Sequence, residues 1–120
     1  MGKYVIKKGK KIHFVLKANN GQIIGTSESY ESEKACTAGI ASVIKNAPAA
    51  KISDTTDENA GKVSNPKFEI YKDKKGDFRF RLLAKNGENI LSSEGYTAKT
   101  GCKKGIDSVI KNADSPTVEE

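Results

Sequence analysis

The sequence has no tryptophan, one histidine, one methionine and two cysteines among its 120 residues. Two cysteines are too few for a disulfide scaffold, and a single histidine without a Cys-x-x-Cys pair offers no metal-ligand pattern. No apolar run approaches the roughly 20 residues that a membrane span needs. The N-terminus, "MGKYVIKKGKK", is charged but lacks the apolar segment of a signal peptide, so we expect a cytoplasmic protein.

Positive charge is present in excess and falls into two blocks. The net charge is +6; residues 1–47 and 66–113 each carry +5, whereas residues 48–65 carry −1 and residues 114–120 carry −3. Two basic units therefore flank an acidic connector. Such units can attract nucleic acid or an acidic partner, and they can equally serve solubility alone.

An internal duplication accounts for the two blocks. The stretch "GIASVIKNA" at 39–47 returns as "GIDSVIKNA" at 105–113, and with an offset of 66 the copies agree at 18 of the 36 positions from 12 to 47. Upstream the offset falls to 64, so the first turn is two residues shorter in the first copy. The repeat predicts one domain over residues 1–120, divided into a first repeat at 2–53, a linker at 54–65 and a second repeat at 66–118.

The residue pattern of each copy predicts three strands followed by a helix. Alternating apolar residues indicate the strands, which we expect at 3–8, 12–18, 23–29, 67–72, 77–84 and 89–95. An Asn-Gly pair, typical of a tight hairpin, separates the second strand from the third in both copies. The period then becomes helical, with apolar stripes at Cys36, Ile40, Val43, Ile44, Ala47 and at Cys102, Ile106, Val109, Ile110, Ala113.

The ends of the elements carry further expectations. Ser32 should cap the N-terminus of the first helix and Thr97 that of the second. Asn46 can take the left-handed conformation at the end of the first helix. A short strand can follow each helix, at 49–53 and near Thr117 and Val118.

One unit of about 46 residues is below the size that usually folds alone. Two units can pair their strand edges and bury a joint layer under two helices. The duplication is therefore a folding requirement, and we expect a monomer because the two copies already supply a twofold arrangement.

The second copy, "FEIYKDKKGDFRFRLLAKNGENILSSEGYTAKTGCKKGIDSVIKNA", resembles the YegP-like (UPF0339) family of small bacterial proteins, and the first copy resembles it more loosely. The resemblance implies an α+β fold: two tandem β-β-β-α-β repeats in one antiparallel sheet, pseudo-twofold symmetric, with both helices on one face and the last strands exchanged. It implies no established activity, ligand or catalytic residue.

We predict no catalytic, cofactor or metal site and do not expect an enzyme. Cys36 and Cys102 lie on the helix stripes and are expected to be buried. His13 alternates with Phe14 and should face away from the helices, with no partner at catalytic spacing. We assign structural roles to the recurring motif residues Glu28, Tyr30, Gly39, Glu94, Tyr96 and Gly105, the glycines allowing close approach of each helix to the sheet or to the other helix. The alternative for the Glu and Tyr of each motif is that they line a pocket at the end of the sheet.

The sheet face that points away from the helices is the best candidate interaction surface. The predicted contact residues on it are Lys7, His13, Lys17, Tyr71, Arg79 and Arg81. We expect this face to bind a protein partner. Weak, sequence-independent nucleic-acid binding is the alternative, although the other strand aromatics point to the core and Tyr71 alone is left for base stacking. A small ligand at the pseudo-twofold axis is a third hypothesis.

Overall fold

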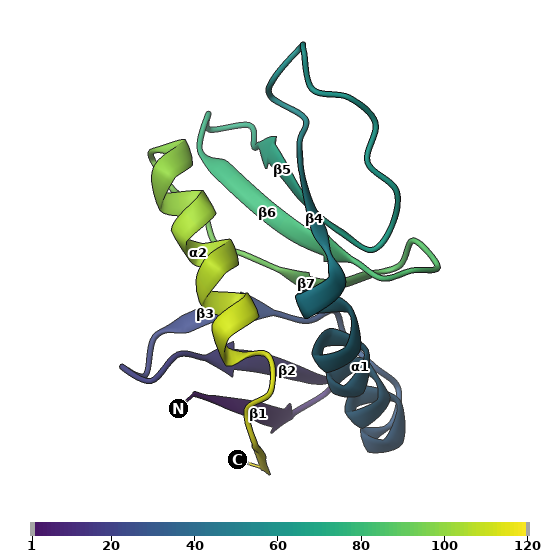
Figure 1. Cartoon of the computed structure of the whole chain (residues 1–120). Coiled ribbons are helices and arrows are strands. Elements are labelled where there is room, and N and C mark those ends of the chain that lie inside the picture. The colour runs from purple at the N-terminus through teal and green to yellow at the C-terminus, as the bar shows by residue number, and fades with distance from the viewer. Residues whose placement is uncertain (1, 120) are drawn as a thin grey trace.

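The computed structural model describes residues 2–119 and confirms an α+β fold of two repeats. The first repeat contains β1 (Lys3–Lys8), β2 (Ile12–Lys17), β3 (Ile23–Thr26), α1 (Glu33–Asn46), a short 3₁₀ turn (Ala47–Ala49) and β4 (Lys51–Asp54). The second contains β5 (Lys67–Lys72), β6 (Phe78–Leu83), β7 (Asn89–Ser92), α2 (Lys99–Asn112) and β8 (Thr117–Glu119). The chain that joins β4 to β5 forms turns and extends from one end of the molecule (Figure 1).

All eight strands form one sheet in the order β4-β5-β6-β7-β3-β2-β1-β8. The order reads the same from both ends when the repeats are interchanged, and at its centre β3 and β7 pair through Thr26 and Ser92. The last strand of each repeat is exchanged: β4 lies beside β5, and β8 lies beside β1. The predicted exchange is therefore confirmed.

The sheet is mixed, which corrects one detail of the prediction. The inner pairings are antiparallel, but both outermost pairings, β4 with β5 and β8 with β1, are parallel. The physical reason is the connection: β4 and β5 are separated by residues 55–66, and β8 and β1 lie at opposite ends of the chain, so no tight hairpin imposes an antiparallel direction on either pair.

Both helices cover one face of the sheet (Figure 1). Their buried stripes join the alternate strand residues in one continuous core, in which Phe14, Leu16, Phe80 and Leu82 are fully buried. The aromatic packing is repeated in the two halves: the ring of Phe14 stacks on one tyrosine, Tyr30, with centroids 6.2 Å apart, and Phe80 stacks on Tyr96 at 6.5 Å.

The helix ends confirm one predicted cap and correct two expectations. Ser32 caps α1, and its Oγ accepts a hydrogen bond from the Ala35 amide at 3.1 Å. In α2 the N-cap is Ala98 instead of Thr97, with no side-chain hydrogen bond, because the helix starts at the position equivalent to its start in the first copy. Asn46 is right-handed rather than left-handed; its amide group donates back to the Ser42 carbonyl, and its Oδ1 accepts from the Lys85 amide of the other repeat.

Candidate interaction surface

The face of the sheet opposite the helices, here called the outer face, carries one continuous row of side chains. Residues paired across strands point to the same face, so the register places this row directly. From one edge of the sheet to the other its members are Val118, Val5, Val15, Thr26, Ser92, Arg81, Glu69 and Ser53. The row is apolar on β8, β1 and β2 and charged on β6 and β5.

The structure splits the six predicted contact residues into two groups. Lys7 pairs with His13 across β1 and β2, and Tyr71 pairs with Arg79 across β5 and β6. Between the two groups lie β7 and β3, so strands β2 and β6 are three strand spacings apart, about 14 Å. A ligand that touched both groups would have to span the centre of the sheet.

In the second repeat the arginines of the outer face are held by carboxylates. The Nε of Arg81 donates to Glu69 Oε1 at 2.7 Å, and the Nε of Arg79 donates to Asp73 Oδ2 at 2.7 Å. The carboxylate side chains are 15% and 16% exposed, whereas the two arginines are 40% and 38% exposed. Each guanidinium therefore lies over its partner and presents its remaining N–H groups to solvent in a fixed orientation.

Two further contacts fix Arg79, Arg81 and Tyr71, which we call the arginine group. The Arg81 guanidinium lies 4.7 Å from the centroid of the Tyr71 ring, and Arg79 also donates to the Ser93 carbonyl oxygen at 3.3 Å. The hydrogen bond from Arg79 lowers the pKa of Asp73 below its usual value, and the same bond raises the pKa of Arg79. Both members of that pair thus stay charged over a wide pH range.

The first repeat replaces the central ion pair by two valines. Val5 and Val15 stand where the second repeat has Glu69 and Arg81, and they are only 5% and 3% exposed. Lys3 pairs with Lys17 on the strands beside them. This half of the outer face therefore combines an apolar centre with a basic border.

Where the repeats meet, the outer face is hollowed. A shallow depression of about 360 Å³ lies there, lined by Thr26, Ser27, Glu28, Arg79, Asn89, Ser92, Ser93 and Glu94. The two Ser-Glu motifs thus converge near the pseudo-twofold axis. The serines are structural: Ser27 Oγ accepts from the Phe14 amide and donates to the Glu28 carbonyl, and Ser93 makes the same two bonds with Phe80 and Glu94.

The tyrosine of each motif faces the glycine of the following helix. A Cβ placed on Gly39 would lie 2.7 Å from Tyr30 Cζ and 3.2 Å from Phe14 Cε2. A Cβ on Gly105 would lie 2.5 Å from Tyr96 Oη. The close approach predicted for these glycines is thus to a tyrosine and a strand phenylalanine; no pattern in the sequence indicates that these two motifs, nine residues apart, form a single contact.

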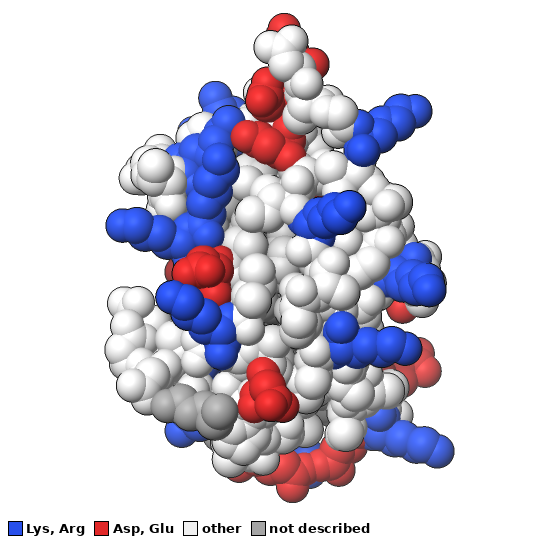
Figure 2. All heavy atoms as spheres, in the orientation of Figure 1, with Lys and Arg blue, Asp and Glu red and all other residues white. Residues whose placement is uncertain are grey.

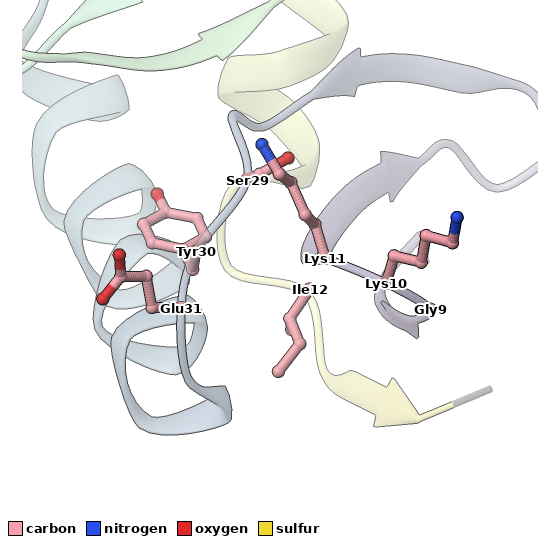
Figure 3. A pocket seen from close by; sticks show the side chains of 7 residues that line it. All are labelled: Gly9, Lys10, Lys11, Ile12, Ser29, Tyr30 and Glu31. Carbon is pink, nitrogen blue, oxygen red and sulfur yellow. The ribbon is translucent and has the colours of Figure 1, made fainter.

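A second depression of about 510 Å³ opens beside the short first turn and is shown in Figure 3. The side chain of Lys11 runs beside Ser29, the Tyr30 ring turns toward α1, and Lys10 points away (Figure 3). In the second repeat the longer turn brings Asp77 against Gly95, the counterpart of Ser29. The depression therefore follows from the two-residue difference in turn length.

The groups with chemical reactivity lie apart from these surfaces. Cys36 and Cys102 are free, fully buried thiols, and burial raises both pKa values, that of Cys102 to about 11. Within residues 2–119 there is no group of three His, Cys, Asp or Glu residues that could hold a metal ion. None of the helices that the structure describes is long and apolar enough to cross a membrane.

Comparisons with known proteins agree with this architecture. The profile of a domain of unknown function, DUF1508, matches twice, at residues 8–54 and 73–120. The UPF0339 protein YegP of Yersinia pestis is 38% identical over 122 residues, covering 100% of this chain and 96% of that protein. A UPF0339 protein of Treponema denticola is 59% identical over 54 residues, which cover 45% of this chain and 93% of that protein.

The solution NMR structure of yegP from E. coli, a protein described as of unknown function, superposes with a TM-score of 0.79 at 32% sequence identity. The match covers 99% of this chain and 92% of that one. Two profile matches, a full-length relative and a full-length structural match all lead to the same assignment. The chain belongs to the UPF0339 family of YegP-like proteins and carries the DUF1508 unit twice.

Proposed function

We propose that the protein is a non-catalytic, monomeric binding module of the cytoplasm that holds a protein partner on the outer face of its sheet. One observation carries the proposal: Arg79, Arg81 and Tyr71 form a pre-organised group on a sheet face that neither helix covers. Arginine and tyrosine are the residue types enriched among energetically dominant interface contacts. Because the arginines are already oriented, binding loses less side-chain entropy.

A protein partner fits this group better than a nucleic acid does. Both arginines have their charge balanced by a carboxylate directly beneath them, so the group adds little net positive charge. The face of Tyr71 that a base would stack on is occupied by Arg81. Hydrogen-bond acceptors on a protein, such as main-chain carbonyls, can still reach the outward N–H groups of the arginines.

The buried thiols support a non-catalytic role. A nucleophilic cysteine needs an exposed thiolate, and here burial raises both pKa values. Two of the hydroxyls in the depression between the repeats, those of Ser27 and Ser93, accept hydrogen bonds from the main-chain amides of Phe14 and Phe80. These assignments leave binding as the activity that the outer face can best perform.

The test removes Arg81 from the arginine group, together with its carboxylate partner, without disturbing the sheet. The variant Glu69→Val/Arg81→Val copies the Val5–Val15 pair that the other repeat already accommodates. Quantitative capture from native cells should show specific partners for the wild type and their loss from this variant. A control, Lys34→Thr/Lys45→Ala, changes exposed residues of α1 and should keep them. An identical set of captured proteins for all three chains would refute the proposal.

A further inference from the structure

The two helices pack alike but present different charges to solvent. Their buried positions are occupied by the same residue types in both repeats. The exposed positions differ: Glu33, Thr37 and Ala38 of α1 correspond to Lys99, Lys103 and Lys104 of α2. As a result α2 carries four lysines against one aspartate, a net +3, whereas α1 carries two lysines against one glutamate, a net +1.

The lysines of α2 lie on its solvent side. The buried residues of α2 form one stripe, and Lys104 and Lys111 fall on the opposite side of the helix, with Lys103 exposed on the flank. Figure 2 shows basic side chains, Lys or Arg, along the side of the molecule where α2 lies, with an acidic side chain among them. We refer to Lys72, Lys99, Lys103, Lys104 and Lys111 as the lysine band.

Equivalent positions at the start of the two helices carry opposite charges. In the first repeat Lys8 forms an ion pair with Glu33 at 3.0 Å, at the start of α1. In the second repeat the counterparts are Lys72 and Lys99, two like charges that lie 5.1 Å and 5.6 Å from the centroid of one ring, that of Phe78. An attractive pair has become a repulsive one, although the same fold is built around it.

The acidic groups near the band compensate only part of its charge. Lys99 is paired with Asp54 of β4 at 2.8 Å, and Lys111 is paired with Asp107 at 3.1 Å. Five lysines against these two acids leave a net +3 on a surface that is about 21 Å long if α2 rises 1.5 Å per residue. Lysines at this density attract a linear polyanion through release of its counterions.

We propose that the lysine band binds the phosphate backbone of a nucleic-acid duplex, independently of sequence. A duplex is favoured over a single strand because the ring of Phe78, at the start of the band, is already engaged by two lysines and is not open to base stacking. The band lies on the helix side of the molecule, so this inference goes beyond the protein-binding role of the outer face and does not depend on it.

The test exchanges the exposed residues of one helix for those of the other. Lys103→Thr/Lys104→Ala gives α2 the residues that α1 already carries, so the fold should tolerate them. Fluorescence anisotropy with a labelled DNA duplex should be measured between roughly 50 and 200 mM salt. For the wild type, the logarithm of the association constant should fall linearly with the logarithm of the salt concentration. In the variant the magnitude of this slope should fall by about 2, because each phosphate that a lysine no longer neutralises lowers it by about 0.9.

Two matched variants make the test specific. Lys34→Thr/Lys45→Ala on α1 removes the same charge elsewhere and should leave the salt slope unchanged. Thr37→Lys/Ala38→Lys builds a second band on α1 and should strengthen binding. The proposal is overturned if the duplex does not bind at the lowest salt, if both lysine-removing variants weaken binding equally, or if polyglutamate or anionic vesicles bind more tightly than the duplex.

Discussion

The ring of Tyr30 rests on the backbone of Gly39, so closely that a Cβ at position 39 would lie 2.7 Å from Tyr30 Cζ. Gly39→Ala should destabilise the protein by about 1–3 kcal/mol through overpacking, although alanine is favoured over glycine in a helix by about 1 kcal/mol. Denaturant unfolding of Gly39→Ala, Tyr30→Leu and the double variant measures the coupling between the two positions. If the loss of unfolding free energy in the double variant equals the sum of the losses in the two single variants, the contact with Tyr30 is not the reason for a glycine at position 39.

The ion pair between Glu69 and Arg81 should contribute little to stability. The pair is partly exposed, and exposed pairs are typically worth about 0–1 kcal/mol. Glu69→Val/Arg81→Val should therefore leave the free energy of unfolding within about 1 kcal/mol of the wild type, with valine also well suited to a strand. Urea denaturation measures this, and the single variant Arg81→Val, which leaves Glu69 unpaired, should be the less stable of the two. A large loss in the double variant would show that the pair maintains the fold.

The elements of this fold are predictable from the sequence because they follow from local patterns. Alternation in "KYVIKK" and helical spacing after Ser32 indicate a strand and a helix regardless of the rest of the chain. The exchange of β4 and β8 follows from a family resemblance instead, and their parallel direction differs from the prediction. The prediction of Thr97 as a cap is wrong. It favours a polar residue, whereas the offset of 66 between the copies places Ala98 at the position of the Ser32 cap, and the helix follows the offset.

The charge pattern is the harder part to predict. Residues 1–47 and residues 66–113 both carry +5, and this equality hides the difference between Glu33 and Lys99. Arg79 and Arg81 predict a basic outer face, but only the strand register and the turn geometry reveal that Glu69 and Asp73 neutralise them. Long-range pairing of side chains depends on such geometry, which composition does not contain.

Tyr4 ties the first strand to the end of the second helix, because its hydroxyl donates to the Ala113 carbonyl at 2.6 Å. The equivalent residue in the second repeat is Phe68, which fits the same core without a hydroxyl. Tyr4→Phe should cost about 1 kcal/mol of unfolding free energy, the usual net value of one such bond, without creating a cavity. Thermal unfolding would show a lower midpoint; an unchanged midpoint would mean that water replaces the tyrosine as donor.

Stability should fall as the pH rises above about 9. Burial raises the pKa of Cys102 from 9.0 to about 11 and also raises that of Cys36. Between pH 9 and 11 the unfolded chain releases thiol protons that the folded chain retains, so the free energy of unfolding decreases by up to about 1.4 kcal/mol per pH unit for one thiol. Urea titrations at pH 7, 9 and 10 measure this slope. In Cys102→Ala the slope should be smaller, whatever that substitution does to stability at pH 7; an equal slope in both chains would assign the effect to other groups.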